Sequence, residues 1–163
     1  MTNNLHTPHG LIRIVSFGYG HGPAPAADLT VDLRRRFRNP HQDPAMRERT
    51  GLDQDVYAHV LDTPGVRACA VWTARTVREL YAAIGGPLVV ATGCTGGRHR
   101  AVGMARAVAA ALADGRLLAV VEHRDVHRAV LPSRVHDTES DPRPAGPDIV
   151  NPLLISPEYR GER

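Results

Sequence analysis

Residues 88–121 read LVVATGCTGGRHRAVGMARAVAAALADGRLLAVV, and this stretch decides the fold. Its first four residues form an apolar run that is typical of a strand covered on both faces. A glycine-rich segment follows, and residues 101–113 then show an alanine-rich helical pattern that ends at Asp114-Gly115. Residues 117–121 form the next apolar run. Strand, glycine loop, helix and strand in this order predict a βαβ unit, and hence a mixed, mostly parallel sheet.

The chain before this unit adds further strands and helices. Alternating and branched apolar residues predict the strands, while Asp53 and Thr63-Pro64 are typical helix-start residues. The expected elements are strands at 11–17 and 29–33 and helices at 53–61 and 63–84. Together they predict a single compact α/β domain with helices flanking the sheet.

The chain has 163 residues, which suits one domain with one core. We expect this domain to span residues 11–130. Residues 1–10 are polar and are expected to be disordered. Residues 131–163 are rich in proline and mixed charges, so we expect an extended tail.

The composition excludes several classes of protein. The two cysteines, Cys69 and Cys94, have no paired spacing, so a disulfide framework is not expected. The N-terminus lacks the basic and apolar regions of a signal peptide, and no apolar run is long enough to span a membrane. His123 and His127 are four residues apart but have no third ligand at a convincing spacing. We therefore expect a cytoplasmic protein with no membrane contact, no metal and no cofactor.

Positive charge is concentrated in two segments. Lysine is absent, so all 20 cationic residues are arginine, against a net charge of only +3. Residues 31–50 contain six arginines and three acidic residues, and residues 94–106 contain three arginines and no acid. Prolines in the first segment favour a loop or irregular arm. Focused positive potential of this kind favours binding of an anion.

The glycine-rich segment between strand and helix is the expected binding site. Backbone N–H groups at such a junction converge, and the helix N-terminus adds partial positive charge. Gly96 and Gly97 allow close approach, Thr95 offers a hydroxyl, and Arg98 and Arg100 can close on the remaining oxygens. The alternative is a plain tight turn with solvated arginines. Two cations at a helix N-terminus oppose its dipole, which favours the anion site.

An enzymatic alternative also uses this loop. Cys94 and Arg100 have the Cys-x5-Arg spacing of cysteine-dependent phosphatases, in which loop amides and the arginine hold phosphate over a thiolate. That pattern expects histidine before the cysteine and a hydroxyl residue after the arginine, where this chain has Gly93 and Ala101. A nucleotide-hydrolysing P-loop is not supported, because the chain has no lysine to complete one.

Short motifs occur in a fixed order from about residue 11 to residue 125. They are Ser16-Phe17-Gly18-Tyr19 with His21-Gly22, the strand from Asp28 to Arg34, Asn39-Pro40-His41 with Asp43-Pro44, Arg47 followed by Thr50-Gly51-Leu52-Asp53, Gly93-Cys94-Thr95-Gly96-Gly97-Arg98-His99-Arg100, and His123-Arg124-Asp125. In its order and spacing this set resembles the C-terminal domain of the RNase adapter RapZ family.

The resemblance implies a pocket for phosphorylated or carboxylated small molecules, formed by two loops and the glycine-rich turn. In that family the domain is associated with sensing an amino-sugar phosphate, with binding a small RNA and with self-association. The implied anion-binding residues are Thr95, Gly96, Gly97, Arg98, His99 and Arg100, with His21, His41, Arg34 and Arg47 at the mouth. His21 and His41 also each fit a role as plain turn residues.

Several departures from the family pattern limit what carries over. Only ten residues precede the first expected strand, whereas full-length members carry an N-terminal kinase-like domain, which here would be a separate partner protein. Gly20 stands where a basic residue is usual, and Ala101 stands in place of serine. RNA contacts depend on such cations and are weakened most. Our first hypothesis is a non-catalytic sensor that binds an amino-sugar phosphate, a nucleotide or an RNA phosphate. The alternatives are a phosphatase or phosphoryl-transfer enzyme using Cys94 and Arg100, and an RNA-binding module using the arm at residues 31–50.

Overall fold

The computed structural model describes residues 12–35, 37 and 46–131. The expected disordered segment at 1–10, His41, and all but the first residue of the expected tail at 131–163 lie outside the described residues.

Four strands and three α-helices make up the described fold. In chain order they are β1 (Ile12–Gly18), the short 3-10 helix η1 (Tyr19–His21), β2 (Leu29–Asp32), α1 (Gln54–Asp62), α2 (Val66–Ile84), β3 (Leu88–Cys94), α3 (Arg100–Asp114) and β4 (Ala119–His123). The sheet has the order β2-β3-β1-β4, and each neighbouring pair is parallel. The predicted α/β class with a mostly parallel sheet is confirmed.

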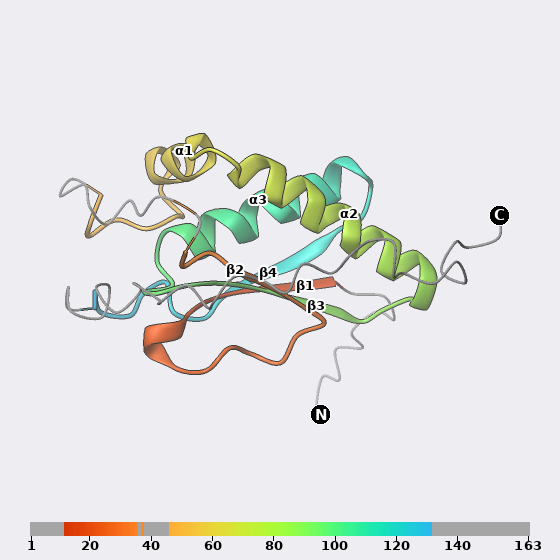
Figure 1. Ribbon diagram of the computed structural model, residues 1–163, viewed down its shortest axis with the longest axis horizontal. Helices are drawn as coiled ribbons and strands as arrows, with labels where there is room; N and C mark the ends of the chain where they lie inside the picture. Colours follow the sequence, from red (N-terminus) through yellow and green to blue (C-terminus); the bar gives the residue numbers. More distant parts are fainter. Residues whose placement is uncertain (1–11, 36, 38–45, 132–163) are drawn as a thin grey trace, which may run out of the picture.

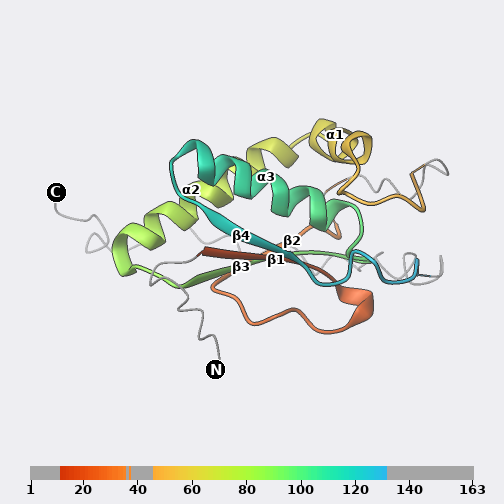
Figure 2. The ribbon, with the colours of Figure 1, turned by 180° about the vertical axis from the view of Figure 1, so that it is seen from behind.

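The three helices lie on one face of the sheet (Figure 1). The connection from β1 to β2 passes across the opposite face, as the reverse view also shows (Figure 2). None of the helices in the described ranges is long and apolar enough to cross a bilayer. Because the strands are parallel, all their carboxyl ends lie at the same end of the sheet, where ligands of open α/β folds bind.

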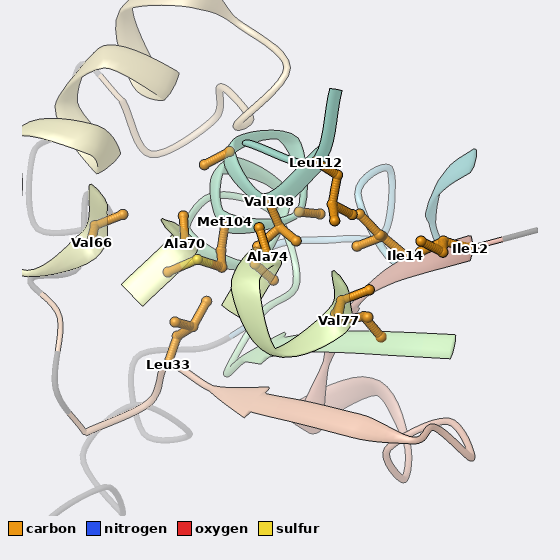
Figure 3. Close-up of a cluster of buried hydrophobic side chains, with 14 of the residues drawn as sticks. Ile12, Ile14, Leu33, Val66, Ala70, Ala74, Val77, Met104, Val108 and Leu112 are labelled. Atoms are coloured by element: carbon orange, nitrogen blue, oxygen red, sulfur yellow. The ribbon is translucent and has the colours of Figure 1, made fainter. Parts of the chain in front are cut away.

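The main core lies between the sheet and helices α2 and α3. Ile12 and Ile14 of β1 belong to this core together with Val77 of α2 and Leu112 of α3 (Figure 3). These four side chains are at most 2 % exposed. Small side chains, including Ala70 and Ala74 of α2 and Ala101, Ala105 and Ala107 of α3, allow the two helices to pack closely. This packing fixes the start of α3 above the ends of β1 and β3.

Two element boundaries differ from the sequence prediction by three residues, for identifiable reasons, and β4 begins and ends two residues later than predicted. Helix α2 starts at Val66, two residues after Pro64, because Gly65 has a left-handed φ of +89° that a helix cannot contain. Strand β3 continues to Cys94, three residues beyond the predicted end, because it stays paired with β1 as far as Gly18. The glycine loop is therefore only five residues long, from Thr95 to His99.

Candidate anion-binding site

The candidate site lies where β1 and β3 end side by side. Gly18 pairs with Cys94 at the last position of both strands. From here the chain leaves β1 towards β2 at one edge of the sheet and leaves β3 towards β4 at the other. The carboxyl ends of adjacent parallel strands whose connections run to opposite sides are the usual ligand position in open α/β sheets.

Two glycines, Gly18 and Gly97, lie at this position, and we call them the glycine floor. A Cβ added at Gly97 would lie 2.6 Å from the backbone nitrogen of Gly18, and one added at Gly18 would lie 2.7 Å from the carbonyl carbon of Gly96. Gly97 also has a φ of +69°, a left-handed conformation that favours glycine. The turn after β1 and the loop after β3 thus touch backbone to backbone.

Gly96 and the start of α3 give the loop its open side. A Cβ added at Gly96 would meet no atom within 4 Å, so this part of the backbone can be approached from outside. No side chain of the described residues caps α3 at His99, and its first turn contains no acidic residue. The first N–H groups of a helix have no partner within it, and they carry the positive end of its dipole. The arrangement suits a bound anion.

Cys94 lies beneath the loop. Its side chain is only 3 % exposed, and its Sγ accepts the Gly97 N–H at 3.2 Å. Thr92 precedes Cys94 by two residues in β3. Its Oγ1 donates to the carbonyl of Ala101 at 2.8 Å and so connects the first turn of α3 to β3. Both contacts hold the loop in shape.

Arg100 binds the backbone of the segment after β2. Its Nη1 donates to the carbonyl oxygens of Leu33, Arg34 and Phe37 at 2.8, 3.1 and 3.2 Å. The residue is 3 % exposed, and its Nε has no partner among the described residues. From the sequence we expected this guanidinium to contact the anion, whereas in the structure its Nη1 donates to protein carbonyls.

Arg98 and His99 hold two further segments in the same way. Arg98 donates from Nη1 to the carbonyl of Arg128 and from Nη2 to that of Glu48, each at 2.7 Å. The His99 Nε2 lies 3.0 Å from the carbonyl oxygen of Met46, so that its N–H tautomer donates there. Three consecutive side chains, at the end of the loop and the start of α3, therefore bind carbonyl oxygens of the segment after β2 and of Met46 and Glu48.

The described residues expected at the mouth of the pocket do not share contacts with one another in the interactions given below. Arg34 pairs with Asp32, with 2.6 Å between Nη2 and Oδ2, and its guanidinium stacks 3.7 Å from the centre of the Tyr19 ring. His21 ends η1, and its Nε2 is buried without a partner in the described part of the chain. Arg47 is exposed. His41 lies outside the described residues, so its place at the mouth stays a prediction.

A family model of the RapZ C-terminal domain matches residues 11–127 of the chain. The chain belongs to the RapZ C-terminal domain family. Residues 12–125 of this match contain every strand and helix described above, together with both halves of the glycine floor. The resemblance inferred from the ordered motifs is confirmed.

Relatives of this RapZ C-terminal domain include larger bacterial proteins. A nucleotide-binding protein of Thermus thermophilus is 44% identical over 121 residues, which are 72% of this chain and 44% of the relative. Nucleotide-binding proteins of Heliobacterium modesticaldum and Streptomyces coelicolor are 41% and 39% identical, over 72% and 71% of the chain and 40% of each relative. The chain thus spans less than half the length of these relatives.

Two further residues of this chain lie at the site, Arg124 and Asp125, although neither was among the expected site residues. Asp125 is 1 % exposed, and its Oδ2 accepts the Gly18 N–H at 2.8 Å. Arg124 donates from Nη2 to the Gly18 carbonyl at 3.3 Å and from Nη1 to that of Pro23 at 2.7 Å. The signal was present, because His123-Arg124-Asp125 is one of the family motifs, but sequence alone did not connect it to Gly18.

The charged groups around the site keep the carboxylates ionised. Burial alone would raise the pKa of Asp125, but hydrogen bonds from Arg124 and the Gly18 N–H, with the charges of Arg124 and His21, hold it below its usual value. For Asp32, burial alone would also raise the pKa, but the hydrogen bonds from Arg34 outweigh burial. The pKa of Asp32 is therefore below its usual value. Within the described ranges, no group of three or more metal-ligating side chains occurs.

His123 is expected to make the stability of the folded domain depend on pH. Its Nδ1 lies 2.7 Å from the buried Ser16 hydroxyl, and burial, followed by the charges of Arg106 and His127, lowers its pKa below the ordinary 6.5. The unfolded chain therefore takes up this proton at a higher pH than the folded chain does. The stability that depends on neutral His123 is complete above about pH 6.5 and is lost as the pH falls towards the lower, folded pKa.

We expect the free energy of unfolding to fall between about pH 7.5 and pH 5.5, and to fall less in a His123→Gln variant. Urea denaturation followed by circular dichroism at the two pH values measures this difference. An identical pH dependence in the two proteins would contradict the assignment to His123.

Proposed function

We propose that this domain binds the phosphate group of a ligand on the glycine loop Thr95–His99 and the N-terminus of α3. The observation that carries the proposal is the open backbone at Gly96, next to a helix start that no described side chain caps. Helix N-termini of this kind bind phosphates through backbone N–H groups and the helix dipole. Arg98 and Arg100 add positive charge, and together with His99 they hold the surrounding segments in place.

All candidate ligands contain a phosphate, and they differ in the group to which the phosphate is attached. The relatives' names support a nucleotide, and the family resemblance implies an amino-sugar phosphate or an RNA. A thermal-shift screen with inorganic phosphate, phosphosugars, nucleotides and dicarboxylates separates the small molecules. A short RNA, tested at two salt concentrations, adds the third class, because phosphate-backbone contacts weaken steeply with salt. Self-association and a separate kinase-like partner remain proposals; analytical ultracentrifugation tests the first.

Gly96→Val tests the proposed loop without disturbing the fold. The new side chain enters open space, so the melting temperature without ligand is expected to stay within about 2 °C of the wild type. The branched side chain would cover the backbone that the phosphate approaches, and we expect ligand-induced stabilisation to disappear. Gly96→Ala is the graded control and should retain part of it. Full stabilisation of the folded Gly96→Val protein would contradict binding at this loop.

One observation favours the alternative of a cysteine-dependent phosphatase. The Gly97 N–H points at the Cys94 Sγ, as loop amides do where phosphate is held over a thiolate. Two observations weigh against it: Cys94 is 3 % exposed, and the Arg100 Nη1 binds carbonyl oxygens. Turnover of an aryl phosphate that is lost in Cys94→Ser would establish the enzyme, and its absence in the wild type would dismiss it.

A further inference from the structure

We propose that Asp125 is a positioning residue for the glycine loop. Its carboxylate holds the turn after β1 in the place where that turn supports Gly97, and ligand binding at the loop depends on this support. The proposal rests on the proposed function for its effect on ligand binding, whereas its effect on the loop itself can be measured without a ligand.

The contacts of Asp125 come from the end of β1 and from its own segment after β4. Oδ2 accepts the Gly18 N–H at 2.8 Å and lies 2.9 Å from Nε and 2.8 Å from Nη2 of Arg124. Oδ1 forms an ion pair with Arg128, at 3.2 Å from its Nε, but has no hydrogen-bond partner among the described residues. A carboxylate that is only 1 % exposed keeps such contacts out of competition with water. Hydrogen bonds to an ionised group of this kind are about twice as strong as neutral ones.

Gly18 connects Asp125 to the loop. Its N–H is held by Asp125 and its carbonyl by Arg124, so two consecutive side chains fix both polar groups of one residue. On its other side the Gly18 backbone touches Gly97, where an added Cβ would lie 2.6 Å from the Gly18 nitrogen and 3.0 Å from the Asp125 Cβ. The Gly20 N–H also donates to the Thr95 carbonyl at 2.9 Å. A shift of this turn would therefore move the loop.

Position and charge predict opposite effects when Asp125 is changed. A negative charge behind the loop repels a bound anion, so its removal would strengthen phosphate binding if Asp125 acted only through its charge. If Asp125 acts by positioning, its removal weakens binding, because the amides of the loop lose their alignment. The low pKa of the buried carboxyl keeps it ionised at neutral pH, so both effects are present in the wild type.

The test compares the 163-residue chain with its Asp125→Asn and Asp125→Ala variants. Asparagine keeps an oxygen for the Gly18 N–H and loses the charge, whereas alanine loses both. Asp28→Ala is the control: the exposed Asp28 Oδ2 accepts the Val89 N–H at 2.7 Å at the opposite end of β3, so a carboxylate to backbone bond of similar length is lost far from the loop. The readouts are the dissociation constant for inorganic phosphate from NMR titration and hydrogen exchange of the Gly97 amide without phosphate.

We expect the dissociation constant to rise about threefold in Asp125→Asn and about tenfold in Asp125→Ala, as expected for weakening and losing one charge-assisted hydrogen bond. The Gly97 amide should exchange faster in the same order, and the control should match the wild type in both readouts. Unchanged or tighter binding by folded Asp125→Asn overturns the proposal; this variant also decides if Asp125→Ala does not fold. If the wild type binds no phosphate, the proposed function fails, and unchanged Gly97 exchange in Asp125→Asn would then overturn the positioning role separately.

Discussion

Replacing Gly97 by alanine is expected to lower the free energy of unfolding by about 3 kcal/mol, because two separate costs add. The first is the left-handed φ of +69°, which costs an L-residue about 1 kcal/mol. The second is overlap, since the new Cβ would lie 2.6 Å from the Gly18 nitrogen. That atom cannot retreat without breaking its hydrogen bond to Asp125. Urea denaturation followed by circular dichroism measures the loss.

Gly96→Ala provides the control for Gly97→Ala within the same loop. It has open space around the added Cβ, so its free energy of unfolding should lie within about 0.5 kcal/mol of the wild type. The two neighbouring substitutions are chemically identical and differ only in what surrounds the new atom. Equal stability of the two variants would show that the Gly18 and Gly97 backbones are not in contact.

Arg100→Ala is the second substitution with a large expected effect, about 3 kcal/mol or more of lost stability. Its Nη1 is the shared donor for the carbonyl oxygens of Leu33, Arg34 and Phe37. The guanidinium is 3 % exposed, so alanine would leave these oxygens without their donor and a space in place of the side chain. For a domain of this size the melting temperature should fall by about 10 °C.

The matched control for Arg100→Ala is Arg75→Ala. Arg75 is exposed on α2, where its guanidinium lies 5.5 Å from the Trp72 ring centre, and its removal should change the free energy of unfolding by at most about 0.5 kcal/mol. Differential scanning calorimetry compares both variants with the wild type. If Arg100→Ala melts like the wild type but loses phosphate binding, the side chain contacts the ligand and the carbonyl bonds contribute little.

The sequence was sufficient to predict the architecture around the glycine loop. The apolar run at residues 88–91, the alanine-rich helix and the next apolar run correspond to β3, α3 and β4, because each has one strong and local pattern. The end of β3 was missed since Thr92, Gly93 and Cys94 look like a loop. Their strand conformation comes from pairing with Ser16–Gly18, far away in the sequence.

The sequence predicted which loop carries the candidate site but could not predict what its side chains contact. The partners of Arg100 lie 63 to 67 residues away and are backbone atoms, which have no signature in a sequence. The link between Asp125 and Gly18, 107 residues apart, depends likewise on the register of β1 and β4. Gly96 and Gly97 could be assigned to the loop from the sequence, because their spacing and their position after a strand are local features.

The carbonyl contacts of Arg98, His99 and Arg100 affect how this domain should be dissected genetically. An alanine scan of its cations would return unstable proteins at the very positions that look most like ligand contacts, and loss of folding would be mistaken for loss of recognition. A separation-of-function allele should instead be sought at Gly96, where bulk can be added without removing any bond that the chain makes with itself.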